Sequence, residues 1–127
     1  MAHVFVNPGD SVPVLASAAR TATPTVDQFE LSGSASGLIL VIDVTAIVST
    51  PSVVFTIKGY DPVSTKTWDV LASVAIATVS TTVLRVSPHL TAAANTVAKD
   101  VVPSVFTLTA AHGNANSITY SVAAQVA

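Results

Sequence analysis

Three histidines are the residues of this sequence best suited to acid–base or metal chemistry, but their spacing keeps them apart. His3, His89 and His112 form no HxH or HExxH pattern, the kind of spacing that zinc sites use. The chain has no cysteine, which excludes thiolate metal sites, disulfides and cysteine nucleophiles. His112 lies in the segment AHGNAN, which is typical of a turn between two strands. The sequence therefore predicts no metal and no cofactor.

Carboxylates and hydroxyl groups give no catalytic pattern either. Asp43 interrupts an apolar stretch, and we expect it to be half-buried beside Arg85 or a strand edge, with no second acid to complete a glycosidase pair. No serine lies in GxSxG, and the five glycines form neither GxGxxG nor GxxxxGK. Asn114 and Asn116 are too few for a calcium loop. We therefore expect no enzymatic activity.

The composition is most unusual in its lack of charge. Charged residues make up 9% of the 127 residues, against about 25% in ordinary domains, and mean hydropathy is +0.66. A net charge of −2 gives no basic stripe, so nucleic acid is not an expected partner. The most apolar run, Leu38 to Ile42, is too short to cross a membrane, and the first residues do not resemble a signal peptide. Two interpretations remain: a surface covered by Thr and Ser, or, as we favour, a subunit that packs its surface against neighbours.

Alternating apolar and polar residues indicate β-strands in most of the chain. The segments 52–60, 104–111 and 117–122 each place apolar residues on one face only, as half-buried strands do. The segment 37–47 is apolar on both faces, which favours a central strand covered on both sides; a short buried helix is the alternative, and the flanking turn residues favour the strand.

Further strands are expected at 25–31, 68–77 and 82–86, whereas 90–98 is expected to be a loop with at most a short helical turn. Pro13 restricts the segment 11–15 to a sheet edge or an arm. The predicted fold is all-β, an antiparallel sandwich or jelly roll of seven or eight short strands with little helix. Residues 14–127 form its single domain, and residues 1–13 form a possible N-terminal arm.

The stretch IKGYDPVSTKTWDVL, residues 57–71, concentrates charge and aromatic residues in what we interpret as a hairpin. Asp61 before Pro62 is typical of a turn, because the Asp side chain can accept bonds from backbone amides. Tyr60 and Trp68 flank the tip. They are either an aromatic cross-strand pair on a solvated hairpin or a contact knob, since both residue types are frequent at interface hot spots.

Several blocks of the chain, from about Phe29 onward, resemble small β-rich proteins of tailed bacteriophages and prophages. The blocks are GLILVIDVTA (37–46), KGYDPVS (58–64) with Trp68, TVLRVSPHL (82–90), NTVAKDVVP (95–103) and the HGN turn (112–114) before SITYS (117–121). They form a pattern of strands and turns without a catalytic signature.

This resemblance implies a non-enzymatic virion structural protein, made in the host cytoplasm and placed on the capsid surface as a decoration or stabilising protein. Its partners would be other copies of itself and the major capsid protein or other virion proteins, with no nucleic acid and no membrane. Decoration proteins commonly hold neighbours with a terminal arm, so Val4, Phe5 and Val6 join Tyr60 and Trp68 as candidate interface residues. An ordinary first strand is the alternative for residues 2–13. The alternative functions are a tail or fibre accessory and a receptor- or carbohydrate-binding module in which Tyr60 and Trp68 form a stacking platform.

Overall fold

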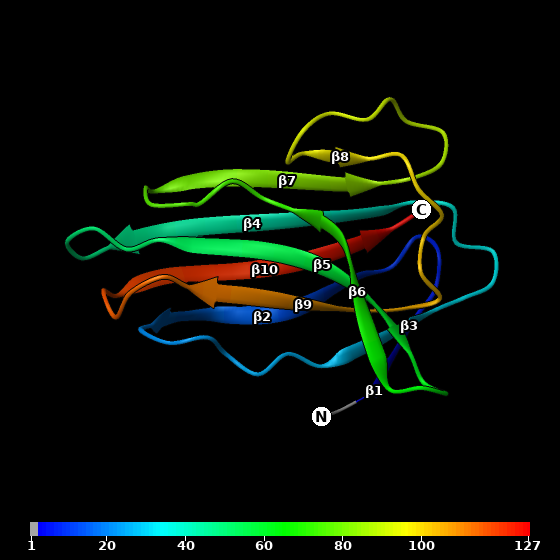
Figure 1. The fold of residues 1–127 in the computed structure, drawn as a ribbon, viewed down its shortest axis with the longest axis horizontal. Helices are drawn as coiled ribbons and strands as arrows, with labels where there is room; N and C mark the ends of the chain where they lie inside the picture. Colours follow the sequence, from blue (N-terminus) through cyan, green and yellow to red (C-terminus); the bar gives the residue numbers. More distant parts are fainter. Residues whose placement is uncertain (1–2) are drawn as a thin grey trace.

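The computed structural model describes residues 3–127, which form two five-stranded β-sheets packed face to face (Figure 1). Sheet A has the strand order β1 (His3–Val6), β3 (Gln28–Leu31), β9 (Val105–His112), β5 (Val53–Asp61) and β6 (Lys66–Ala72). Sheet B has the order β2 (Ser11–Arg20), β10 (Ile118–Val126), β4 (Leu38–Ile47), β7 (Ser80–Val86) and β8 (Val97–Ala98). No helix occurs within these residues, and the predicted all-β sandwich is confirmed.

Most neighbouring strands are antiparallel, and the two parallel pairs, β1 with β3 and β7 with β8, lie at sheet edges. The long strands of both sheets run in nearly the same direction in Figure 1, as expected of an aligned sandwich, whereas β6 crosses them steeply. The predicted loop at 90–98 is a loop that ends in the two-residue strand β8.

The core lies between the sheets and follows the period-2 pattern of the sequence. In β10 every second side chain from Ile118 to Val126 is buried, and β5 buries Val53, Phe55 and Ile57 in the same way. Aromatic rings pack within the core: the Phe55 and Tyr120 rings meet edge to face with centroids 5.1 Å apart. Contacts of this kind favour one arrangement of the core over others.

The apolar segment is β4, the middle strand of sheet B, so its predicted central position is confirmed and its predicted coverage on both sides is wrong. Only its inner face is fully covered, since Leu40 and Ile42 are buried whereas Ile39 and Val41 on the outer face are half-buried. The second apolar face of this strand is therefore not covered by any other layer within residues 3–127.

The N-terminal segment takes part in both sheets of its own chain. Strand β1 lies beside β3, a tight turn at Asn7–Asp10 with Gly9 at φ +90° redirects the chain, and β2 then joins sheet B. The segment expected to form an arm or an ordinary first strand thus consists of β1, the turn and the start of β2, while Met1 and Ala2 lie outside the described residues. Pro13 is in the edge strand β2, as its missing N–H requires.

Candidate functional site

The β5–β6 hairpin is closed by Asp61, as the Asp–Pro pair predicts. Its carboxylate accepts bonds from the Val63 and Ser64 amides, at 3.1 and 3.3 Å, and from the Ser64 hydroxyl at 2.7 Å. The Ser64 hydroxyl and then the Val63 amide hold the pKa of Asp61 below its ordinary value. The Thr65 amide closes the turn on the Asp61 carbonyl. The tip is therefore a structured turn.

Tyr60 and Trp68 lie on opposite faces of sheet A, so the expected aromatic pair and shared stacking platform are wrong. Tyr60 is opposite Thr67, and Trp68 is opposite Gly59. Because successive residues of a strand point to opposite sides, Tyr60 faces outward, and the Trp68 ring lies across the inner side of Gly59, where a Cβ atom would collide with it. Trp68 remains 48% exposed. A bulge between Ile57 and Lys58 sets this register, which the sequence alone did not reveal.

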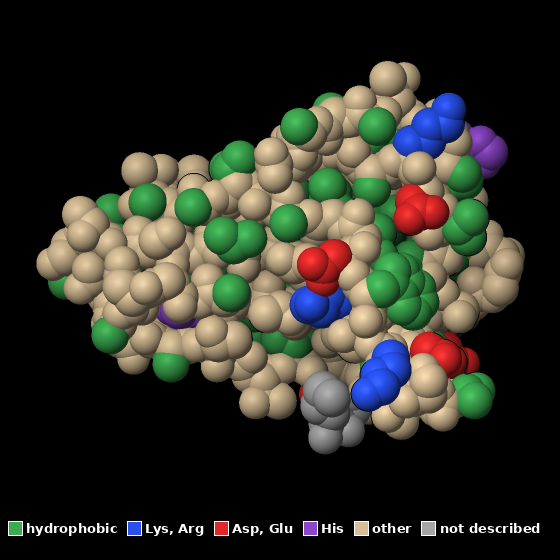
Figure 2. Space-filling model, in the orientation of Figure 1, with side chains coloured by type: hydrophobic (Ala, Val, Ile, Leu, Met, Phe, Trp, Pro, Cys, Tyr) green, Lys and Arg blue, Asp and Glu red, His purple; other side chains and the backbone are tan. Residues whose placement is uncertain are grey.

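Charged side chains on the visible face gather toward the end of the molecule that carries this hairpin, whereas the other half shows no Lys, Arg, Asp or Glu (Figure 2). On sheet A, the Lys58 ammonium bonds the Asp69 carboxylate of the neighbouring strand at 2.7 Å. The His3 ring nitrogen lies 2.9 Å from the Glu30 carboxylate. The polarity of residues 57–71 is therefore largely satisfied within the hairpin.

A groove of about 380 Å³ runs between the hairpin and the segment that leads into β3, over the outer face of sheet A. Threonine is the most frequent residue of its lining, with Tyr60 and Gln28 beside the threonines, which are Thr23, Thr25, Thr65, Thr67, Thr107 and Thr109. Thr107 is fixed by a 2.9 Å bond from its hydroxyl to the Asp27 carbonyl. Hydroxyl groups and one aromatic ring can bind a polar, uncharged ligand. The groove is formed by residues from distant parts of the chain, so no local sequence motif predicts it.

A cluster of polar side chains that the sequence analysis did not predict, Arg20, His112 and Tyr120, lies at one end of the core. The fully buried Tyr120 bonds its hydroxyl to the His112 ring at 2.9 Å, and the Arg20 guanidinium lies 4.6 Å from the Tyr120 ring centre. Burial raises the pKa of Tyr120 to about 12, and burial together with the Arg20 charge lowers the pKa of His112. The contact joins β9 of sheet A to β10 of sheet B. The apolar alternation around Tyr120 was the available signal, because a buried hydroxyl needs a partner.

Asp43 is half-buried as expected, but Arg85 is not its partner. Its carboxylate accepts a 3.4 Å bond from Thr81, the residue opposite on β7, whereas Arg85 is opposite Ile39. Asp43 therefore lies two residue pairs from the Val41–Val83 pair in one direction along the strands, and Arg85 lies two residue pairs from it in the other direction. Neither forms an ion pair within residues 3–127.

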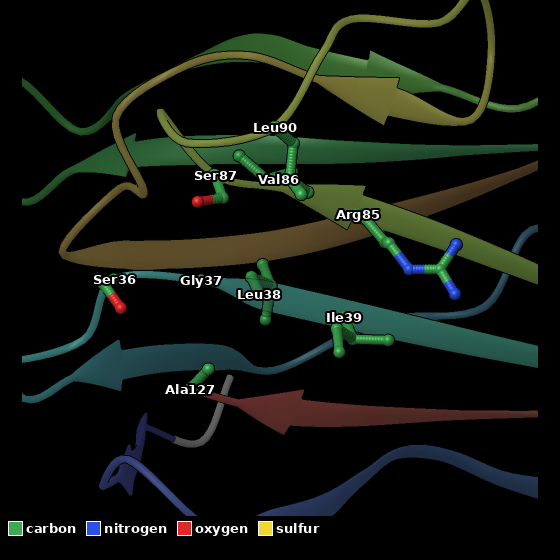
Figure 3. A pocket seen from close by; sticks show the side chains of 9 residues that line it. All are labelled: Ser36, Gly37, Leu38, Ile39, Arg85, Val86, Ser87, Leu90 and Ala127. Carbon is green, nitrogen blue, oxygen red and sulfur yellow. The ribbon is translucent and has the colours of Figure 1, made fainter.

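A smaller hollow of about 280 Å³ lies where β4 begins and β7 ends (Figure 3). Leu90, from the loop after β7, borders it on one side, and Ile39 and Arg85 border it on the other. In Figure 3 the Arg85 guanidinium extends away from Leu90. The hollow is mostly apolar.

The candidate interface residues of the first strand differ in exposure. Phe5 is 71% exposed, Val4 packs partly against the core, and Val6 is buried in it. Phe5 can therefore meet another molecule, whereas Val6 stabilises its own chain.

Among residues 3–127, no three His, Asp or Glu side chains are grouped as metal ligands would be. The same residues contain no helix long and apolar enough to span a bilayer. Comparisons with models of known protein families, with curated proteins and with solved structures find no significant match.

Proposed function

We propose that this chain is a non-enzymatic structural protein of a tailed-phage virion, a capsid decoration or stabilising protein that assembles as an oligomer on the capsid surface. The observation that carries the proposal is a surface poor in charge and rich in exposed apolar side chains. Val63, Val101 and Phe5 are 91%, 74% and 71% exposed, in a chain with 9% charged residues. Such a surface favours association with other proteins. The resemblance of the strand and turn blocks to phage proteins supplies the virion context.

The edges of the sheets support association through faces and loops. Strands β1 and β8 are short, β2 carries Pro13, and β6 carries Lys66 and Asp69. Short strands, proline and charges all discourage edge-to-edge pairing. Contacts with other copies or with the major capsid protein would then use the exposed apolar residues and the outer face of sheet B.

The decisive experiment is to purify particles of the phage that encodes the chain, identify the chain by mass spectrometry and locate it by electron cryomicroscopy. We expect repeated density for this sandwich on the head, and particles lacking it should lose their contents at lower temperature. Density on the tail would support the tail or fibre accessory instead. Absence from purified particles would refute the proposal.

The threonine-lined groove favours carbohydrate or receptor binding as the second candidate function. Tyr60 is the aromatic ring that lines it, and Trp68 lies on the opposite face. If glycans bind there, Tyr60→Ala should weaken binding on a glycan array at least about fivefold, since one stacked ring contributes on the order of 1 kcal/mol or more. Trp68→Ala is the matched control and should leave binding unchanged. Equal loss in both variants would point away from the groove.

A further inference from the structure

The outer face of sheet B combines apolar and uncharged polar side chains with two charged ones, and no other layer within residues 3–127 covers it. Its half-buried positions on the three inner strands β10, β4 and β7 include Ile39, Val41, Val83 and Ala123. Among the outward positions of these strands, only Asp43 and Arg85 are charged. We propose that this face binds the same face of a second copy, forming a two-fold symmetric dimer in which Asp43 of each copy pairs with Arg85 of the other. The inference rests on the proposed function, because it names the surface through which the chain associates with itself.

The register of β4 and β7 makes the charges self-complementary. Val41 is opposite Val83, Asp43 lies two residues from Val41 in one direction, and Arg85 lies two residues from Val83 in the other. Each charge is therefore about 7 Å along the strands from this central pair, on opposite sides. Consider a two-fold axis that lies in the plane of the interface, runs perpendicular to the strands and passes through the Val41–Val83 pair. Rotation about this axis places the end of one copy that carries Asp43 above the end of the other that carries Arg85. A symmetric interface needs this reciprocity.

The distances suit such a contact. Stacked sheets lie about 10 Å apart, and a long Arg side chain together with an Asp side chain can span that gap. Figure 3 shows the Arg85 guanidinium beside Ile39, extended away from Leu90. The hollow of about 280 Å³ between Leu90, Ile39 and Arg85 leaves space for side chains of the second copy.

The face covers more than half of the area that a standard interface buries. The ten residues of β4 extend over about 33 Å, and the three strands β10, β4 and β7, spaced about 4.8 Å apart, are about 14 Å wide. The plane therefore measures about 470 Å² per copy, and its accessible area is larger because side chains project from it. Standard interfaces bury about 800 Å² per partner. Covering the second apolar face of β4 in this way would also complete the burial that its sequence indicates.

Charge reversal tests the dimer with the full chain. We expect the wild-type chain to sediment as a dimer, and Asp43→Arg or Arg85→Asp alone to raise the dimer Kd at least about 100-fold, because each places like charges together. The double variant Asp43→Arg/Arg85→Asp should restore the dimer. An equimolar mixture of the two single variants should also dimerise, because each supplies the charges that the other lacks. Melting temperatures of the diluted variants verify that they fold.

The outcomes separate this inference from the proposed function. Single variants that dimerise as tightly as the wild type, or a double variant and mixture that stay monomeric, would overturn the inference. A wild-type chain that is monomeric in solution would overturn it as well. The presence of the chain on purified virions, measured independently, decides the proposed function in each of these cases.

Discussion

Opposite charges form an ion pair on the outer face of sheet A but lie apart on the outer face of sheet B. On sheet A, Lys58 and Asp69 on adjacent strands bond at 2.7 Å. On sheet B, Asp43 and Arg85 also lie on adjacent strands, but the register separates them by four ladder positions and each lacks an ion pair within residues 3–127. Position along the strands, and not the choice of strands, thus decides whether opposite charges pair within one chain or remain available to another.

The uncharged residues on the two outer faces also differ. The outer side of sheet A carries threonines and Tyr60, which line a groove. The outer side of sheet B carries Ile39, Val41 and Val83; the Val41–Val83 pair lies between the two separated charges, and Ile39 is opposite Arg85. We therefore propose sheet B, and not sheet A, as the face that meets another copy.

The largest expected effect comes from placing a cation at the centre of each outer face. Val41→Lys should weaken self-association at least about 100-fold, about 2.7 kcal/mol, because the ammonium would have to be buried at the centre of the interface. Thr56→Lys, at a half-buried outward position on sheet A, is the control and should leave association unchanged. Sedimentation velocity over a range of concentrations measures both. Equal weakening would show that the two faces do not differ as proposed.

A smaller effect, on the stability of the monomer, is expected at the contact between Gly59 and the Trp68 ring in sheet A. Gly59→Ala should lower the free energy of unfolding by about 1–3 kcal/mol, because the new Cβ would displace the Trp68 ring. Urea unfolding followed by the fluorescence of Trp68, the only Trp of the chain, measures this directly. The control Gly33→Ala has open space around its Cβ and should change stability by no more than about 0.5 kcal/mol. A similar loss in both variants would contradict this account.

The polar contact that joins the two sheets should give a loss of about 1 kcal/mol when Tyr120→Phe removes its hydroxyl. It should also make stability depend on pH. The pKa of His112 is lower in the folded chain than its ordinary 6.5, so the unfolded chain binds the proton first as the pH falls. Stability is then complete above pH 6.5 and decreases as the pH falls below that value.

His112→Gln should remove this part of the pH dependence, as thermal unfolding between pH 5 and 8 can show. A slope that persists unchanged in the variant would assign the effect to another group. Asp61 gives a separate contribution at lower pH, because its pKa is lowered from 3.8 in the folded chain, so its stabilising effect is lost only as the pH falls below that value.

The smallest effect is expected for the exposed ion pair of sheet A. Lys58→Gln should reduce stability by less than about 1 kcal/mol, and the difference should shrink in 1 M salt, because Asp69 is largely exposed. Arg85→Gln should leave the stability of the diluted monomer unchanged, since Arg85 has no ion pair to lose within residues 3–127. Unfolding measured at low protein concentration compares the two variants. A larger loss for Arg85→Gln would reverse the comparison between the faces.

The amino-acid sequence by itself determined the fold class, most of the strands and the Asp61 turn. These follow from local rules: alternation with period 2, the preference of β-branched residues for strands, and the backbone chemistry of Asp and Pro. It also identified β4 as a central strand and Pro13 as an edge residue, because continuous apolar character and a missing N–H each have only a few compatible places in a sheet.

Only the tertiary structure decided which residues meet. A bulge of one residue put Tyr60 and Trp68 on opposite faces, and the register of β7 paired Asp43 with Thr81 and not with Arg85. The threonine groove and the contact between His112 and Tyr120 likewise join segments distant in the chain. The physical reason is that a shift of one residue reverses every side chain of a strand, and such shifts are set by packing across the whole sandwich and not by the strand's own sequence.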